Sequence, residues 1–190
     1  PRKTLPLLRR AYADETDNKR KVIYARILGV LGDDTGISTL IDRIESFEKW
    51  GEGFKWRSPS RTIYGRALSE LDGLIMAAGF SGSPGALQPI LEKLEILTDK
   101  HWFSHHRAVA LALETLADSA AAEPLARHLQ KPGISGYAIT DIAKATDKQT
   151  ISNLASIVEN SFREIILTRA LYPCGDHNGI AEKILAQYCR

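Results

Sequence analysis

The sequence predicts an all-α protein, an α-α superhelix of about five helix pairs. A turn between amphipathic segments recurs five times, and the positions five and nine residues after each turn are always apolar. Recurrence of one unit along a chain is the signature of a repeat protein. No stretch of alternating β-branched residues, which would predict strands, competes with this helical spacing.

The clearest unit occupies residues 22–44. Both of its halves carry apolar residues at helical spacing. In chain order these are Val22, Ile23, Ile27, Val30 and Leu31, then Ile37, Leu40, Ile41 and Ile44. Gly32 and Asp33 separate the halves; glycine ends helices readily, and an Asp side chain accepts hydrogen bonds from the free N–H groups of the next helix. The unit therefore predicts a helix, a tight turn and a second helix.

The other four units repeat this arrangement at uneven spacing. The turn positions are Gly32, Gly82, Ala117, Thr146 and Gly175, each followed by a predicted cap, Asp33, Ser83, Asp118, Asp147 and Asp176. The apolar positions beyond them are Ile37, Leu87, Ala122, Ile151 and Ile180, then Ile41, Leu91, Ala126, Ala155 and Ile184. Pro84, Pro89 and Pro124 fall in predicted first turns of second helices, where proline is tolerated. Units this short cannot bury their own apolar faces, so they must stack.

A helix, a Gly-Asp turn and a second helix resemble HEAT repeats, particularly the short HEAT-like repeats of phycobilisome lyases. The resemblance covers residues 20–190 and implies a single HEAT-like repeat domain, a solenoid, over residues 1–190. Because the chain starts at Pro1 without a methionine, we expect it to be excised from a longer protein. HEAT-like arrays serve as scaffolds, nucleic-acid binders and appended domains, so the fold alone does not fix the function.

An insertion interrupts the array at residues 48–66. The first interval between turns is 15 residues longer than the second, and the excess holds two of the three tryptophans. Its aromatic and basic residues form a candidate interface: Trp50, Phe54, Trp56, Arg57, Arg61, Tyr64 and Arg66. They could pack back onto the solenoid, bind a protein or another part of the same polypeptide, or stack bases and hold phosphates. We expect Trp50 or Trp56 to be buried against the first two helix pairs, with Arg57 and Arg61 at a rim.

Charge is distributed unevenly along the chain. Residues 1–66 carry 14 Lys and Arg against 9 Asp and Glu, whereas the remaining residues carry 11 against 14. This asymmetry weakly favours an anionic partner for the N-terminal third, but a solvated basic face is the preferred explanation. The net charge is only +2, so binding to nucleic acid is expected to be weak. No apolar run approaches the ~18 residues of a membrane helix.

Three histidines lie in HWFSHHR, at His101, His105 and His106. The spacing of His101 and His105 would suit a metal on a helix, but Ser104 is predicted to cap the following helix and to leave His101 outside it. His105 and His106 are then expected in a first turn, exposed at one rim, as further candidate interface residues. Cys174 and His177 lack the further ligands or orienting group that a metal site or a nucleophile requires. No catalytic, cofactor-binding or metal residue is therefore assigned.

Several strings resemble a more specific group of proteins. These are YGRALSELDGLIMAAG (64–79), FSHHRAVALALETLAD (103–118), PLARHLQKPGISGYAITD (124–141) and REIILTRALYPCGDHNGIAEKILAQY (163–188). Together they resemble the C-terminal HEAT-like region of bacterial FAD-dependent oxidoreductases. The resemblance implies a preceding flavoprotein portion that holds the FAD. The glycine-rich FAD fingerprint belongs to that absent portion, so this chain is expected to bind no FAD.

The leading hypothesis is a non-catalytic HEAT-like domain, the C-terminal part of a FAD-dependent oxidoreductase, that packs on the flavoprotein portion or recruits another protein. The alternatives are a stand-alone protein-interaction scaffold and, less favoured, a HEAT-type nucleic-acid binder. An upstream glycine-rich fingerprint in the open reading frame would distinguish the first from the second.

Overall fold

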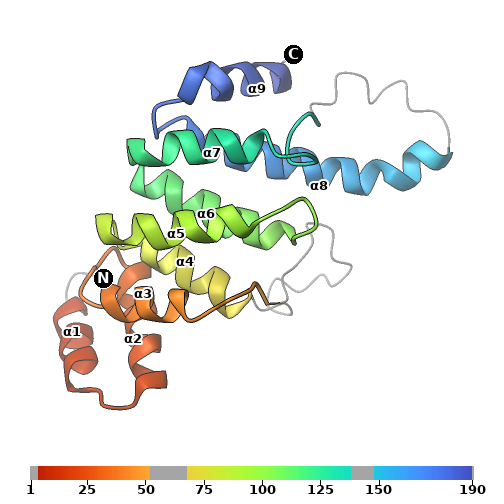
Figure 1. Cartoon of the computed structure of the whole chain (residues 1–190). Helices are drawn as coiled ribbons and strands as arrows, with labels where there is room; N and C mark the ends of the chain where they lie inside the picture. Colours follow the sequence, from red (N-terminus) through yellow and green to blue (C-terminus); the bar gives the residue numbers. More distant parts are fainter. Residues whose placement is uncertain (1–3, 52–67, 138–147, 190) are drawn as a thin grey trace.

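The computed structural model describes residues 4–51, 68–137 and 148–189, and within these ranges all secondary structure is helical (Figure 1). The α-helices are α1 (Leu5–Asp14), α2 (Asn18–Val30), α3 (Ile37–Glu45), α4 (Glu70–Phe80), α5 (Leu87–Ile96), α6 (Phe103–Leu116), α7 (Ala122–Leu129), α8 (Lys148–Leu171) and α9 (Ile180–Tyr188). Short 3-10 helices precede α5, α7 and α9, at Pro84–Ala86, Ser119–Ala121 and His177–Gly179. The predicted all-α class is confirmed for the described residues. None of the described helices combines the length and apolar character that crossing a bilayer demands.

The turns lie where the repeat predicts them. Gly32, Gly82, Ala117 and Gly175 all have positive φ, at 78°, 72°, 48° and 113°. This left-handed conformation ends a helix, and glycine adopts it at the lowest steric cost. The remaining predicted turn, Thr146, lies outside the described residues. The four predicted turns that the structure describes therefore lie at the predicted residues.

Two of the predicted caps form, and two do not. Asp33 Oδ1 accepts from the N–H of Thr35 at 3.0 Å, but Thr35 lies ahead of α3, whose N-cap is Gly36 without a side-chain cap, so the predicted Asp33 cap is wrong. Asp118 Oδ1 accepts from the N–H of Ala120 at 2.9 Å and caps the 3-10 helix before α7. The Asp176 carboxylate accepts from two N–H groups at the start of α9. Ser83 makes no side-chain cap, so that prediction is wrong. Its own N–H instead donates to Ser81 Oγ at 3.2 Å.

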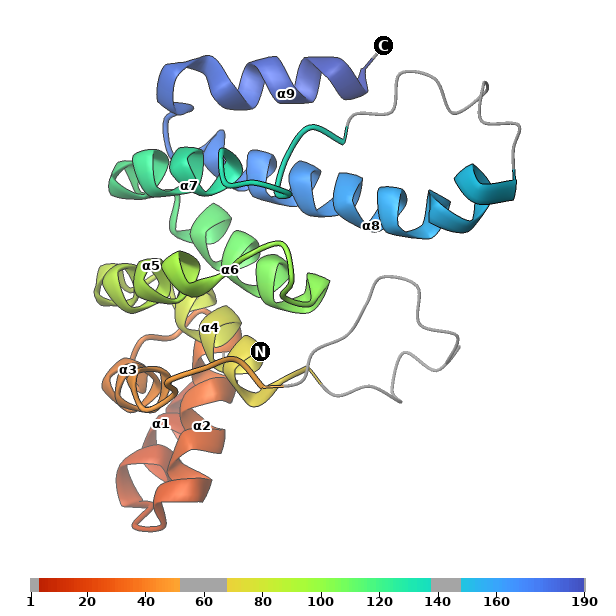
Figure 2. The ribbon, with the colours of Figure 1, turned by 45° about the vertical axis from the view of Figure 1, so that its right-hand side comes forward.

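The helices form two layers. In the first, α2 packs on α4, α4 on α6 and α6 on α8; in the second, α3 packs on α5 and α5 on α7. Figures 1 and 2 show the helix pairs following one another from α1 and α2 at one end to α9 at the other. The buried apolar side chains lie between the layers, with Leu40, Leu74, Ile90, Leu113 and Leu125 at most 1% exposed. Most of the core thus comes from contacts between pairs.

Small residues let the first-layer helices approach closely. A Cβ added to Gly29 of α2 would lie 2.3 Å from the carbonyl oxygen of Ala77 in α4. One added to Gly79 of α4 would lie 2.4 Å from the Cα of Ala112 in α6. Neither position has room for a side chain. These two glycines fix the distance between three successive helices.

Two features differ from the predicted series of helix pairs. α8 runs for 24 residues without a break, so the second helix of the fourth predicted pair and the first helix of the fifth are one helix. The predicted division into separate helices there is wrong. In addition, α1 precedes the first predicted pair and packs on α2. It is held by Arg9 Nε, which donates to Asp33 Oδ2 at 2.7 Å, and by a 2.7 Å hydrogen bond between Tyr12 and Thr39.

Candidate functional site

The structure describes only three of the candidate interface residues. Phe54, Trp56, Arg57, Arg61, Tyr64 and Arg66 lie outside the described residues. Trp50 is 8% exposed, and His105 and His106 are both fully buried. The expectation that His105 and His106 are exposed at a rim is therefore wrong.

The position of α6 explains why these histidines are buried. The helix begins at Phe103, with Trp102 at its N-cap, so Ser104 lies inside the first turn and the predicted Ser104 cap is also wrong. α6 packs against α4 on one side and α8 on the other. A first turn in the middle of such a stack has neighbours around it, whereas the same turn in an isolated pair would face water.

Trp50, His105 and Asp72 form a cluster at the base of the insertion, which we call the Trp50 cluster. The Trp50 ring lies on His105 with centroids 4.6 Å apart and planes tilted by 32°. His105 Nδ1 lies 2.7 Å from Asp72 Oδ1, and both side chains are fully buried. Asp72 also belongs to the capping box of α4 with Ser69. Because the chain enters the insertion at Trp50 and reaches α4 at Ser69, this cluster holds both ends of the insertion.

The burial of Trp50 confirms the prediction that one of the two tryptophans is core-like. Its ring neighbour, His105, belongs to the third helix pair and not to the first two, so the predicted location is only partly right. A carboxylate paired with an imidazole also occurs in catalytic sites, where it orients a general base. Here both groups are 0% exposed, so a substrate could not reach them, and the geometry supports a structural role.

A second group of buried polar side chains joins α6, α7 and α8. The rings of His106 and His128 have centroids 5.6 Å apart, and His106 Nε2 lies 3.1 Å from the carbonyl oxygen of Thr98. Arg163 Nη1 donates to the carbonyl oxygen of Asp99 at 3.2 Å, and Nη2 donates to that of Gly133. Arg163 thereby ties α8 to the loops that follow α5 and α7.

Burial keeps both imidazoles neutral. Desolvation, reinforced by Arg163 and His128, lowers the pKa of His106 well below its usual value. Desolvation, reinforced by Lys131 and Arg163, lowers the pKa of His128 to about 3.

Within the described ranges, no three His, Cys, Asp or Glu side chains lie together as a metal site requires. His101 Nδ1 accepts from the N–H of Thr98 at 3.0 Å, so this nitrogen is already used, and the His101–His105 spacing gives no ligand pair.

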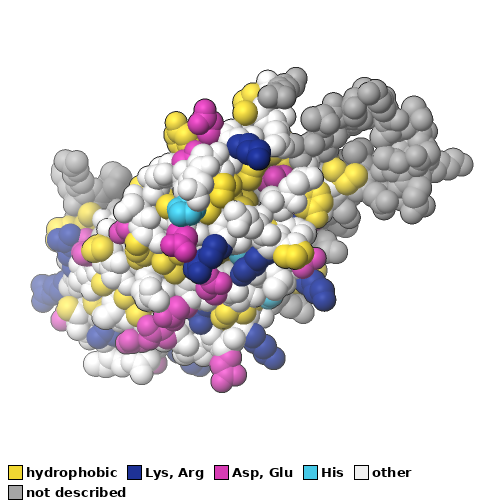
Figure 3. Space-filling model, turned by 45° about the horizontal axis from the view of Figure 1, so that its top comes forward, with side chains coloured by type: hydrophobic (Ala, Val, Ile, Leu, Met, Phe, Trp, Pro, Cys, Tyr) yellow, Lys and Arg dark blue, Asp and Glu magenta, His cyan; other side chains and the backbone are white. Residues whose placement is uncertain are grey.

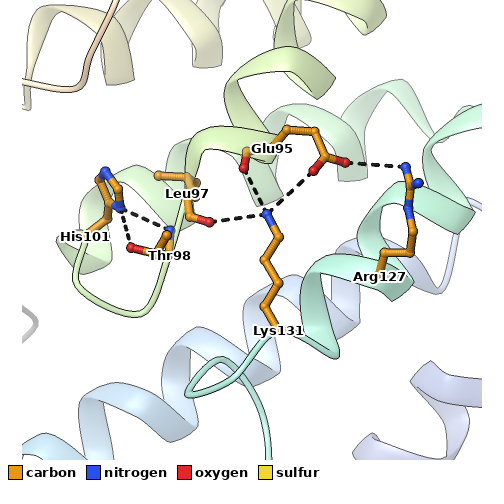
Figure 4. Close-up of polar contacts among 6 residues, drawn as sticks. All are labelled: Glu95, Leu97, Thr98, His101, Arg127 and Lys131. Carbon is orange, nitrogen blue, oxygen red and sulfur yellow. Dashed lines mark hydrogen bonds and ion pairs between the residues drawn. The ribbon is translucent and has the colours of Figure 1, made fainter.

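Figure 4 shows an ion-pair network beside this group. Lys131 Nζ donates to the carbonyl oxygens of Glu95 and Leu97 at 2.9 and 3.4 Å, and it lies 3.6 Å from Glu95 Oε2. Arg127 Nη2 lies 3.4 Å from Glu95 Oε1. These charges satisfy one another and link α7 to the end of α5. They therefore stabilise the junction between two helix pairs and leave no charge directed at a ligand.

An apolar groove of about 390 Å³ lies between α2 and α4. Its lining is Ile23, Arg26, Ile27, Val30, Leu31, Leu68, Gly73, Met76 and Phe80. The α2 side is well exposed: Ile23 is 54%, Ile27 40%, Val30 58% and Leu31 43% exposed. A cluster of apolar side chains this open to water is typical of a binding surface. We refer to it as the α2–α4 groove.

The apolar stripe of α2 does not reveal this groove in the sequence, because helical spacing alone does not show which face of the helix packs. α2 packs through another face, made by Ala25, Leu28 and Gly29. Small residues allow close approach on that face: a Cβ on Gly36 would meet Ala25 at 2.7 Å, as one on Gly29 would meet Ala77. The spacing of Ala25 and Gly29, four residues apart, is the signal that could have identified the packed face.

One cation lies in the α2–α4 groove. The Arg26 guanidinium lies against Gly73, where an added Cβ would be 2.4 Å from Nη2. No residue in the described part of the chain forms a hydrogen bond or ion pair with Arg26. α2 has three further basic residues, Lys19, Arg20 and Lys21, and no acidic one. Arg20 pairs with Glu15 and Asp17, and Lys21 lies over the Tyr12 ring, so the described lining of the groove is apolar with Arg26 as its cation.

Comparison of the sequence and the structure with protein-family models, curated proteins and solved structures finds no match in any of the three.

Proposed function

We propose that this chain is a non-catalytic, HEAT-like helical repeat domain that binds another protein, or another part of its own polypeptide. The α2–α4 groove is the observation that carries the proposal. Burying an exposed isoleucine contributes about 1.5–3 kcal/mol, so covering four large aliphatic side chains would provide a substantial driving force for association.

The order of packing supports a solenoid, or α-α superhelix. Each first-layer helix contacts the next one along the chain, and three pairs share the same left-handed turn at Gly32, Gly82 and Ala117. Stacked pairs present extended surfaces, which repeat proteins use for binding. This architecture suits a binding role better than catalysis at an enclosed site.

If the partner is another part of the same polypeptide, it is the flavoprotein portion of a FAD-dependent oxidoreductase. The support for it is the similarity of residues 64–79, 103–118, 124–141 and 163–188 to the C-terminal region of such enzymes. In that arrangement the FAD and the chemistry belong to the flavoprotein portion, and this chain holds it in place or recruits a further protein. A stand-alone scaffold would use the same groove for a separate protein.

Photo-crosslinking in the native host tests the proposal. With p-benzoylphenylalanine in place of Ile27, which is 40% exposed, we expect a discrete crosslinked protein product, or an intramolecular one in a longer polypeptide. The matched control places the same group at Ser38, exposed on α3 in the other layer, and should give less of that product. Absence of any product from Ile27 would contradict the proposed function.

Binding to single-stranded nucleic acid is expected to be weak and non-specific. The net charge is +2, and the face in Figure 3 mixes basic, acidic and hydrophobic side chains without a single-sign stripe. At ~150 mM salt, phosphate-driven binding of so few charges has largely faded. Fluorescence anisotropy with a labelled oligonucleotide should give a dissociation constant well above micromolar. A submicromolar value would favour the nucleic-acid alternative.

A further inference from the structure

We propose that the α2–α4 groove binds an amphipathic helix of a partner protein, and that a carboxylate on this helix pairs with Arg26. The inference rests on the proposed function and adds the chemistry of the partner. Two properties of the groove carry it: the helical spacing of its apolar side chains and the unpaired cation among them.

The exposed side chains have the spacing that receives a helix. Ile23, Ile27, Val30 and Leu31 follow the i, i+4, i+7, i+8 pattern along α2, and Met76 and Phe80 are four apart on α4. The stripe from Ile23 to Leu31 extends about 12 Å, which is about two turns of a helix. Two parallel ridges with a hollow between them accept the apolar face of a third helix.

Arg26 determines what that apolar face must carry. The guanidinium is partly buried, and no described residue pairs with it. An apolar partner would remove its remaining water without replacing the lost hydrogen bonds, which opposes binding. A carboxylate positioned over Arg26 would instead form a charge-assisted, bidentate pair. The groove therefore selects a helix with one acidic side chain within its apolar face.

The charge on α2 argues against a second copy of this chain as the occupant. Arg26 is the cation that lines the groove, whereas Arg20 pairs with Glu15 and Asp17 and Lys21 lies over the Tyr12 ring. A symmetric dimer through this groove would bring the two Arg26 guanidinium groups toward each other, with no acidic residue on either α2 to pair with them, and like charges in contact oppose association. A partner helix with a carboxylate meets no such repulsion. The hollow shape of the surface also suits a helix better than a flat lipid headgroup layer.

A designed peptide pair tests this chemistry on the full chain. The probe is a fluorescein-labelled amphipathic peptide of about four helical turns, with leucines at i, i+4, i+7 and i+8 and one glutamate among them. The reference probe has glutamine in place of the glutamate. We expect the wild-type chain to bind the glutamate peptide about tenfold more tightly than the glutamine peptide. Arg26→Gln should abolish this preference while leaving the glutamine peptide's affinity nearly unchanged.

Two surface variants complete the experiment. Ile27→Asp should weaken the binding of both peptides more than about tenfold, because it places a charge on the apolar ridge that the peptide covers. Ile96→Asp is the matched control, since Ile96 of α5 is 42% exposed and lies outside the groove; it should bind like wild type. Circular dichroism on each variant verifies that the fold is retained.

Several results would overturn the proposal. These are equal affinity for the two peptides, a preference retained in Arg26→Gln, or no binding of either peptide. A dimer in sedimentation that Ile27→Asp dissociates would identify a second copy as the occupant. Binding to phosphatidylserine vesicles that is lost in Ile27→Asp would identify a membrane surface as the partner of the groove. If a peptide binds only after a Gly-Ser linker replaces residues 52–67, the occupant of the groove in the intact chain would be the chain's own insertion. If crosslinking from Ile27 gives a product but the two peptides bind equally well, the proposed function is supported and the proposal of an acidic partner helix is wrong.

Discussion

Lowering the pH from 7 to 5 should destabilise the protein, with about 2 kcal/mol of the loss coming from His128 alone. Its pKa is lowered from 6.5 to about 3 by burial first and by Lys131 and Arg163 next. The unfolded chain takes up a proton at this imidazole below about pH 6.5, whereas the folded chain does not. Unfolding is therefore accompanied by proton uptake at low pH. The free energy of unfolding decreases as the pH falls from about 6.5 to the pKa of His128 in the folded chain.

His106 acts in the same direction. Burial lowers its pKa well below the usual value, so it too stays neutral in the fold and becomes charged on unfolding. The two rings lie 5.6 Å apart, and protonating both would bring two positive charges together beside Arg163. The acid sensitivity should therefore be steeper than one histidine can explain.

Urea denaturation at pH 7, 6 and 5 measures this effect. The informative variant is His128→Leu, because neither ring nitrogen of His128 has a partner in the described part of the chain and no hydrogen bond is lost. The variant should reduce the change in the free energy of unfolding between pH 6 and pH 5 by about 1.2 kcal/mol. An unchanged dependence would mean that His128 is not held neutral in the fold.

The turns between helices were predictable because their signals are local. A left-handed turn needs a residue such as Gly32 or Gly175, and the free N–H groups after it need an acceptor such as Asp118, so each leaves a mark in the sequence. The continuity of α8 was also readable, since no glycine or proline occurs between Lys148 and Leu171. The uneven spacing of the turns obscured that signal.

The site was less predictable because it depends on which helices become neighbours. HWFSHHR looks like an exposed helix start, and only the packing of α6 between α4 and α8 buries His105 and His106. The stripe on α2 has the same appearance whether it faces a neighbour or water. His105 pairs with Asp72, which lies 33 residues earlier in the chain, and no sequence pattern around either residue predicts this pair.

Trp50→Ala should lower the free energy of unfolding by about 3–5 kcal/mol, the usual cost of removing a buried tryptophan. The side chain is 8% exposed and belongs to the main hydrophobic core. Its ring also covers His105, whose pair with Asp72 is fully buried. Opening this pair to water on one side would weaken its alignment, so the loss should lie toward the upper end of the range.

Two further variants separate the packing role of Trp50 from a general effect of losing a tryptophan. Trp50→Phe keeps an aromatic face on His105 and should retain most of the stability. Trp102→Ala removes a ring that is 37% exposed and should cost less than Trp50→Ala. The melting temperature and the urea midpoint measure the stability of all three variants.

Because Trp50 and Ser69 both contact the Asp72–His105 pair, Trp50→Ala should also make the insertion more susceptible to limited proteolysis. If the melting temperature and the cleavage rate both stay unchanged, Trp50 does not anchor the insertion, and its ring would instead be available to a partner.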